Sequence, residues 1–356
     1  MSVTEQVEFT AEELLATDDV AEPLVVGGVR CHGGIAGDGS YVSPRTRHRT
    51  PAIEAWQAQH ARQFPDRPLL DIGLDRWPGP VPTVDQTRFL LREGLTEPVV
   101  AMLTRIGTVE GFGSFLRYTV VPDLPSMVVE DITGTALAHL DRGLIEAHAR
   151  DEAGWDASDG PAEAGHRDMW FAARDIAFED PVTQDQTELM LERMGIRGPG
   201  GGAGPAAAPP RRLPDDVDPQ LELLLDRMAR LLLIEVSAFH TFAWAEDVLS
   251  DRDLVAGEGD AAFLVSCIRA DETPHVEYLK TVLSEVRDRT IIGTSGARHD
   301  GAEVIGTIWD AAVADALGPR REELQRTAMA EVAHAARGRS DGDDLLREFE
   351  RIGKVA

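Results

Sequence analysis

The sequence has little cysteine and far fewer basic than acidic residues. Of its 356 residues only 2 are cysteines, Cys31 and Cys267, which excludes a disulfide framework and favours a reducing compartment. The 35 Lys and Arg residues face 62 Asp and Glu residues, and the resulting formal charge of -27 repels phosphate backbones and anionic membranes. We therefore expect no nucleic acid and no membrane among the partners of this protein.

Targeting signals and common catalytic motifs are also missing from the sequence. Residues 1–20 are acidic and lack the basic and apolar parts of a signal peptide. No uninterrupted apolar run reaches the ~18 residues that a membrane span needs. We find no phosphate-binding loop, dinucleotide fingerprint, Gly-x-Ser-x-Gly or His-Glu-x-x-His motif. The sequence thus predicts a cytoplasmic protein outside the common nucleotide-binding and hydrolase classes.

The first 82 residues differ in pattern from the remainder of the chain. They are rich in Gly and Pro and hold short β-like pieces, with "GDG" at 37–39 as a turn and one short helix near 51–63. This pattern predicts that residues 1–82 form an extended arm or small hairpin that covers part of a helical body. A hydrophobic content of 43% is ample for the core of that body.

From residue 83 onward the hydrophobic pattern is helical, which predicts an all-α bundle over 83–356. The Gly- and Pro-rich segment 195–216 predicts a flexible connection between two groups of helices. The expected helices cover residues 83–94, 96–118, 134–155, 161–178, 218–251, 260–286, 302–317 and 320–337. Asp159 precedes the fourth of these helices, and Pro161 begins it.

Glu235 lies among apolar residues at helical spacing, so the pattern predicts that its carboxylate is buried. An unpaired buried carboxylate is costly, and it would be protonated, ion-paired or bound to a metal. Glu272 and His275 share an apolar stripe on the next helix, in the Glu-x-x-His spacing by which bundle helices bind paired iron or manganese ions. Pro274 means that this helix either ends near Thr273 or has a kink that aims His275.

Two other Glu-x-x-His pairs occur, and we interpret both as structural. Glu163 and His166 fall in the first turn of an expected helix, where an acid is favoured by the helix dipole. Glu331 and His334 lie on a helix of mostly small residues near the C-terminus. Only Glu272 and His275 combine an apolar surround with an acid on the adjacent helix.

The spacing of the acids predicts a second half-site. In antiparallel helices that rise ~1.5 Å per residue, Glu235 and Glu272 come to similar height, and so do Glu110 and Glu146. The two intervals are nearly equal, at 36 residues from 110 to 146 and 37 from 235 to 272. This near-equality favours Glu110 and Glu146 as the matching pair.

The first half nevertheless lacks the expected histidine, because position 149 is Ala. A second register pairs His148 with Glu152, four residues apart in "HARDEAGW", and its "RDEAGW" echoes "ADETPH". The similar height of Glu110 and Glu146 along their helices favours Glu146 as the ligand. The register that uses His148 and Glu152 stays open. A ligand from His148, His166 or "RCHGG" at 30–34 would also complete the site. The glycines at 107, 111 and 113 either let a neighbouring backbone approach Glu110 closely or end its helix.

The order Glu110, Glu146, Glu235 and Glu272-x-x-His275 resembles the ferritin-like di-iron carboxylate superfamily over about residues 97–287. The resemblance implies a four-helix bundle that holds two iron ions, or manganese in their place, and activates dioxygen as co-substrate. It implies Glu110 and Glu235 as terminal ligands, Glu146 and Glu272 as bridging ligands and His275 as a neutral nitrogen ligand. The missing first histidine leaves a mononuclear or asymmetric site open.

The leading hypothesis is thus a di-iron oxidase or monooxygenase that acts on a small organic substrate, with an electron donor that the sequence does not identify. The sequence allows a homodimer. One alternative keeps this chemistry in a heme-oxygenase-like helical fold. Another is a metal-free helical binding protein in which Glu235 and Glu272 pair with arginines, namely Arg227, Arg230 or Arg269. A third is a ferroxidase or storage role.

Overall fold

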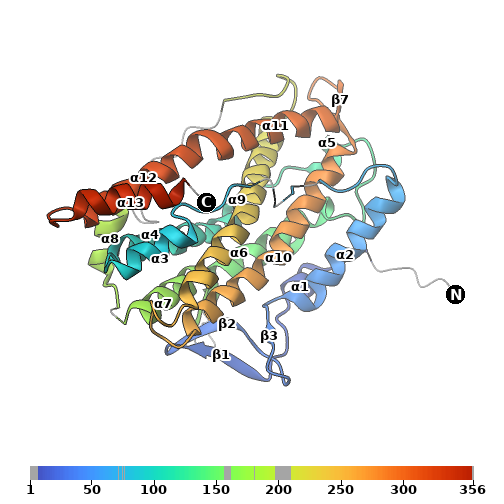
Figure 1. The fold of residues 1–356 in the computed structure, drawn as a ribbon. Coiled ribbons are helices and arrows are strands. Elements are labelled where there is room, and N and C mark those ends of the chain that lie inside the picture. The colour runs from blue at the N-terminus through green and yellow to red at the C-terminus, as the bar shows by residue number, and fades with distance from the viewer. Residues whose placement is uncertain are drawn as a thin grey trace.

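The computed structural model describes residues 7–70, 72–73, 75, 77–155, 162–179, 181–196 and 210–354. This part of the chain is mostly helical, as the sequence predicts (Figure 1). The predicted helix start at Pro161, the Asp159 before it and most of the predicted connection 195–216 lie outside the described residues.

Two long helices, α9 (Pro219–Leu249) and α10 (Asp260–Arg287), lie side by side in the middle of the molecule (Figure 1). The carboxylate of Asp218 caps α9 by accepting from the N–H groups of Gln220 and Leu221, and Pro219 suits the first turn. Helix α10 continues through Pro274. The alternative that this helix ends near Thr273 is therefore wrong.

The apolar core is divided along these two helices. One cluster of buried apolar residues contains Met228, Leu232 and Val236 of α9 with Tyr278 and Leu279 of α10. The other contains Ala238 and Phe242 of α9 with Leu264, Val265 and Ile268 of α10. Glu235, Glu272 and His275 occupy the level between the two clusters. A buried polar layer thus separates two apolar regions.

Helix α4 (Glu97–Glu110) is shorter than the helix predicted over 96–118. After Glu110 the chain tightens into the 3₁₀ helix η2 (Gly113–Tyr118), so Glu110 is the last residue of α4. The preceding helix, α3 (Val84–Arg92), begins at Thr83 with a reciprocal capping interaction between Thr83 and Gln86. By length and composition alone, the stretch Glu97–Tyr118 could cross a membrane, but much of α4 is buried inside the protein against α7 (His166–Phe178).

The single helix predicted over 134–155 is wrong. The segment is divided into η3 (Leu137–His139), η4 (Leu140–Leu144), α6 (Ile145–Ala153) and the short strand β4 (Gly154–Trp155). Gly143 breaks the helix at φ 125°, and a Cβ there would lie 3.2 Å from Ala11 in α1 (Ala11–Leu15). Because α6 begins only at Ile145, the height argument that favoured Glu146 does not hold.

Helix α7 begins at His166, and Glu163 lies before it in the strand β5 (Glu163–Ala164). This placement corrects the prediction of Glu163 in a first helical turn. Strand β5 pairs with β4, and their backbones approach so closely that a Cβ on Gly165 would lie 2.3 Å from the backbone nitrogen of Gly154. Glycine at both positions therefore lets the end of α6 lie beside the start of α7.

The N-terminal region forms the predicted hairpin. It contains β1 (Glu22–Val26), β2 (Val29–Ile35), β3 (Tyr41–Val42) and α2 (Thr46–Gln63). The "GDG" turn joins β2 to β3, and an additional turn at Gly27 and Gly28 joins β1 to β2. Strand order in the sheet is β1-β2-β5-β4, with β3 also on β2. Helix α2 packs against α10, so this region contacts the middle of the molecule (Figure 1).

The remaining elements surround this core. They are α5 (Leu124–Met127), α8 (Gln184–Arg193), β6 (Thr290–Ile292), β7 (Arg298–Asp300), α11 (Gly301–Asp315), η5 (Ala316–Arg320), α12 (Arg321–Ala335) and α13 (Gly342–Gly353). Helices α11 and α12 match two predicted helices, whereas α8 and α13 were not predicted. Helix α11 packs along α9, and α12 packs against α4.

Candidate metal centre

Seven side chains with metal-binding atoms meet in the polar layer of the core. They are Glu110 of α4, His148 and Glu152 of α6, His166 of α7, Glu235 of α9, and Glu272 and His275 of α10. Six of them are buried, and the side chain of Glu110 is only 11% exposed. Four carboxylates and three imidazoles thus share one site inside the protein.

The seven residues form two groups that share Glu152. One group is His148, Glu152, Glu235 and His275, and the other is Glu110, Glu152, His166 and Glu272. Within each group, one potential ligand atom from every residue lies within 4.8 Å of the others. Two neighbouring groups with a common carboxylate are the arrangement that a pair of metal ions requires.

In the first group, two imidazoles face the carboxylates. Nε2 of His148 lies 3.2 Å from Oε1 of Glu235 and 3.4 Å from Oε1 of Glu152. Nδ1 of His275 lies 2.6 Å from Oε2 of Glu272 and 3.8 Å from Oε1 of Glu152. The two imidazole rings are stacked, with centroids 3.6 Å apart.

In the second group, one imidazole faces three carboxylates. Nδ1 of His166 lies 2.9 Å from Oε1 of Glu272, 3.1 Å from Oε2 of Glu152 and 3.8 Å from Oε2 of Glu110. Glu152 and Glu272 therefore each direct one oxygen toward His166 and the other toward the first group. These two carboxylates lie where bridging ligands would lie.

Each of the three histidines has a polar neighbour at the nitrogen that faces away from the carboxylates. Nε2 of His275 lies 3.0 Å from Asp151, and Nε2 of His166 lies 3.4 Å from Asp271. Nδ1 of His148 lies 3.0 Å from the Tyr278 hydroxyl. Such partners fix the ring orientation and the tautomer of a metal-binding histidine.

The N-terminal region holds these two aspartates in place. Asp151 lies 2.9 Å from Nε of Arg45 and 2.6 Å from Nη1 of Arg49 at the start of α2. Asp271 accepts a hydrogen bond from the Tyr41 hydroxyl at 2.9 Å and lies 2.9 Å from Nε2 of His32. Residues of the hairpin and α2 therefore complete the surroundings of the centre.

Electrostatics within the centre distribute protons unevenly. Burial and the charge of Glu152 raise the pKa of Glu110 well above its ordinary value, and burial with the charge of Glu235 does the same for Glu272. Burial and the nearby His148 lower the pKa of His275 to about 4, although Asp151 opposes this shift. His275 is therefore a neutral imidazole at pH 7, which is the form that binds metals.

Glu152 and His166 shift in the opposite directions. Burial alone would raise the pKa of Glu152, but His166 and His148 outweigh it and hold this pKa below its ordinary value. Burial likewise opposes protonation of His166, but Glu152 and Glu272 raise its pKa well above the usual range. Without a metal, protons must occupy the space between these groups.

Three atoms of the centre show that protons alone satisfy it poorly. Nε2 of His148, Nε2 of His166 and Oε1 of Glu272 are buried and have no well-aligned hydrogen-bond partner in the described part of the chain. Buried polar atoms are rarely left in this state, and an ion is one explanation. A mixed set of imidazole and carboxylate donors suits iron or manganese. The residues present therefore fit a pair of such ions.

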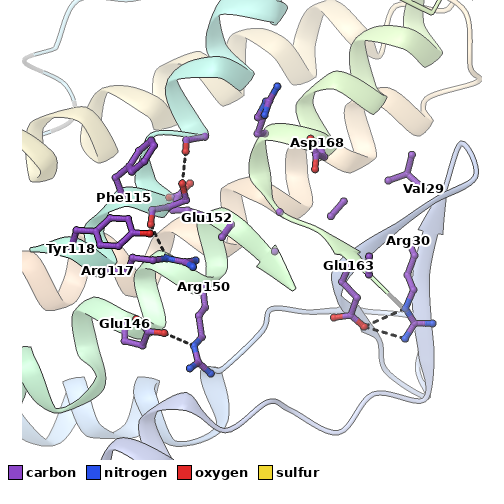
Figure 2. A pocket seen from close by; sticks show the side chains of 18 residues that line it. Val29, Arg30, Phe115, Arg117, Tyr118, Glu146, Arg150, Glu152, Glu163 and Asp168 are labelled. Carbon is purple, nitrogen blue, oxygen red and sulfur yellow. Dashed lines mark hydrogen bonds and ion pairs between the residues drawn. The ribbon is translucent and has the colours of Figure 1, made fainter. Parts of the chain in front are cut away.

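A surface cavity of about 750 Å³ reaches the centre at Glu152. It lies between η2 and α6 on one side and β2 and β5 on the other, with Glu152 between them (Figure 2). Glu152 is the one member of the seven-residue centre that lines this cavity. A small molecule in the cavity would therefore meet the centre at the carboxylate that the two groups share.

The structure brings together six of the seven residues that the sequence predicts as ligands. These are Glu110, His148, Glu152, Glu235, Glu272 and His275. Glu146 lies elsewhere: it pairs with Arg150 at 2.7 Å, is 39% exposed and lines the surface cavity. The preference for Glu146 over the His148 and Glu152 register is thus corrected.

The sequence interpretation treated the Glu163 and His166 pair as structural, and it named His166 only among the alternative ligands that would complete the site. The usual signal of such a histidine, the acid three residues earlier, is misleading, because Glu163 pairs with Arg30 at 3.1 Å and takes no part in the centre. The repeated Asp-Glu step at 151–152 and 271–272 is a better signal. In both cases the Glu enters the centre and the Asp holds a histidine that another helix supplies.

The other candidates from the sequence have structural partners. His32 lies 2.9 Å from Asp271 and forms with it and His166 a third group of potential ligand atoms within 4.8 Å of one another, whereas Glu331 pairs with Arg193. The three glycines near Glu110 permit close approach: a Cβ on Gly107 would lie 2.8 Å from Cβ of Trp170, and one on Gly113 would lie 2.3 Å from Cγ of Glu152. Glycine is therefore needed where α4 and η2 pack on α7 and on the shared carboxylate.

Comparisons with protein-family models, curated proteins and solved structures give no match for this chain.

Proposed function

We propose that this protein is a non-heme di-iron oxidase or monooxygenase that uses dioxygen on a small organic substrate. The observation that carries the proposal is the buried meeting of four glutamates and three histidines in two groups that share Glu152. In a ferritin-like arrangement, α9 and α10 would supply one half of the centre, and α4 with α6 would supply the other. His166 of α7 would then replace the histidine that position 149 lacks.

Each residue of the centre has a separate task in this proposal. Two iron ions, or manganese in their place, would supply dioxygen activation when bound. Glu152 and Glu272 would bridge the two positions, Glu110 and His166 would hold one of them, and Glu235, His148 and His275 would hold the other. Asp151 and Asp271 lie beside Nε2 of His275 and of His166, and a proton held there would leave the lone pairs of the two Nδ1 atoms available to the metal ions.

The surroundings of the centre limit access by water. Apolar clusters lie above and below the polar layer along α9 and α10, and the cavity at Glu152 provides an approach for a substrate. Exclusion of water protects reactive oxygen chemistry from side reactions. The protein would therefore admit a substrate at one edge of the centre while it shields the remainder.

The metal-free alternative requires cations that lie elsewhere. Arg230 pairs with Asp226 and Asp315, and Arg269 pairs with Glu246 at 2.8 Å. Arg227 is exposed. Among the residues that the structure describes, the four glutamates of the centre therefore lack the arginine partners that a buried ion-pair network would need. This placement favours the metal-binding proposal over the binding-protein alternative.

Metal content per chain tests the proposal. Protein expressed with added iron and with added manganese would be measured as wild type and as Glu235→Ala and His275→Ala. We expect two metals per wild-type chain, fewer in each variant, and a charge-transfer absorption band in the iron form with dioxygen consumption on reduction. Absence of metal from every preparation, with both variants still folded, would overturn the proposal.

A further inference from the structure

We infer that the cavity beside Glu152 binds a small organic anion with an aromatic or apolar body, and that Arg117 and Arg167 hold its negative group. This inference rests on the proposed function for the reaction at the centre, and it adds the class of substrate. It starts from the arginines of the cavity, which are notable in a chain whose formal charge is -27. Arg30, Arg117, Arg150 and Arg167 all line it.

Two of these arginines already have acidic partners. Arg30 lies 3.1 Å from Glu163 across the β2–β5 side of the cavity, and Arg150 lies 2.7 Å from Glu146 within α6 (Figure 2). The charges of Arg30 and Arg150 are compensated by these acids, so the two side chains mainly form part of the cavity wall. They contribute less to the attraction of a ligand.

The other two arginines have no acidic partner in the described part of the chain. Arg117 is exposed, and its Nε donates to the carbonyl oxygen of Ser114 at 3.0 Å. Arg167 is half-buried beside the Phe171 ring, at 5.2 Å from the centroid, and its Nε is buried without a hydrogen-bond partner. A guanidinium group with free donors binds carboxylate or phosphate through charge-assisted hydrogen bonds.

Aromatic rings line the same cavity as these cations. Phe115 and Tyr118 line the same cavity from η2, and they are 45% and 70% exposed. Their ring centroids are 6.2 Å apart (Figure 2). Exposed rings at the mouth of a cavity are suited to cover the flat or apolar body of a ligand. The unpaired arginines and the exposed rings together suit an anion that also has an apolar body.

The far end of such a ligand would face Glu152. The cavity of about 750 Å³ falls in the size range of small-molecule sites. The charge of the four glutamates would be balanced by two divalent ions, so a loaded centre would not repel an anion. Asp168 also lines the cavity and is exposed. Its negative charge would repel the anionic group of the ligand and favour placement of that group at the arginines.

Binding of matched probes to the full-length protein tests the inference. Calorimetry would compare phenylacetate with phenylacetamide, which has a similar shape and no charge, and with phenyl phosphate. We expect phenylacetate to bind about tenfold more tightly than the amide, and Arg117→Gln and Arg167→Gln each to weaken it about tenfold while the amide is unaffected. Arg326→Gln removes an exposed arginine of α12 and serves as the control for net charge.

The possible outcomes separate this inference from the proposed function. Equal binding of acid and amide, or binding of the acid that neither arginine variant changes, would overturn the inference even in a metal-loaded protein. Arginine-dependent binding of phenylacetate by a protein that retains no metal would support the anion site and sink the oxidase proposal. Preference for phenyl phosphate over phenylacetate would assign the negative group as a phosphate, and the reverse preference as a carboxylate.

Discussion

Helix α10 carries two buried polar clusters that differ in how their charges are balanced. At its C-terminal end, the Asp288 carboxylate lies 2.8 Å from His60, 3.3 Å from Arg67 and 2.5 Å from Arg287. In the middle of α10, Glu272 and His275 belong to a centre in which four carboxylates share three imidazoles, and no arginine of the described residues pairs with these carboxylates. The first cluster is complete as an ion-pair network, whereas the second has more carboxylates than cations.

The pKa values follow this difference. Burial would raise the pKa of Asp288, but Arg287 and His60 hold it below its ordinary value, so the carboxylate is charged and paired. Burial and neighbouring acids raise the pKa values of Glu110 and Glu272 instead. A structural cluster supplies its own counter-charges, whereas the centre lacks them, as we expect of the proposed metal site.

The largest expected effect is loss of metal from a variant of the shared carboxylate. Glu152→Gln should abolish binding of both ions, because Glu152 belongs to both groups of the centre. Glu146→Gln, six residues away on the same helix, should keep both ions, because Glu146 pairs with Arg150 outside the centre. Metal analysis of the two purified variants checks this pair. Similar metal contents in both would contradict the His148 and Glu152 register.

Another buried acid, Glu285 of α10, provides a test that depends on pH. Burial raises the pKa of Glu285 to about 7, although Arg289 and the N–H groups of Leu137 and Ala136 oppose the shift. The folded protein therefore holds a proton that the unfolded chain releases above an ordinary pKa of 4.5, and stability falls as the pH rises between these two values. Glu285 is thus intermediate between the two clusters in how its charge is balanced, because Arg289 and two N–H groups offset only part of the effect of burial.

Substitution of Glu285 should remove this loss of stability at high pH. From pH 5 to pH 8, the free energy of unfolding of Glu285→Gln should rise relative to wild type by up to about 3 kcal/mol, on the basis of 1.36 kcal/mol per pKa unit. Denaturant unfolding of both proteins at several pH values measures the difference. A difference that does not change with pH would mean that Glu285 is not protonated in the folded state at pH 5.

A substitution in the Asp288 cluster should change the stability of the protein but not its metal content. Asp288→Asn leaves His60 and Arg287 without their counter-charge and should lower the free energy of unfolding by about 2 kcal/mol. Its metal content should equal that of the wild type, because Asp288 lies outside both groups of the centre. Thermal unfolding and metal analysis of the same preparation check both expectations. Loss of metal from this variant would show that the two clusters are coupled.

The smallest expected effect comes from a residue with no ligand atom. Gly113→Ala places a Cβ 2.3 Å from Cγ of Glu152 and should displace this carboxylate, which we expect to weaken metal binding about tenfold. Gly306→Ala on α11 is the control, because a Cβ there meets nothing within 4 Å. Competition with a chelator gives the two affinities. Equal affinities would mean that Glu152 can adjust without cost.

The sequence predicts the parts of the fold and site that local patterns determine. The apolar periodicity and the cap at Asp218 place α9 and α10 correctly, and the burial of Glu235, Glu272 and His275 follows from their apolar neighbours. The hairpin over residues 22–42 is also correct in its main turn. These features depend on periodicity and turn chemistry, which can be read from a single sequence.

The errors at the site involve contacts between distant segments. Gly143 ends the predicted helix before Ile145 because α1 packs against it, and α1 is more than a hundred residues away in sequence. His166 reaches the centre because Gly154 and Gly165 bring two backbones together. Asp151 is held by Arg45 and Arg49 from the N-terminal region, whose role no local pattern indicates.

The most direct test of the central claim is X-ray diffraction from crystals of the iron-loaded protein at energies above and below the iron absorption edge. We predict two anomalous peaks in the polar layer between α9 and α10. One would be enclosed by His148, Glu235 and His275 and the other by Glu110 and His166, with Glu152 next to both. Crystals of iron-supplemented protein that show no anomalous peak among these residues, or a peak only at another place, would contradict the account.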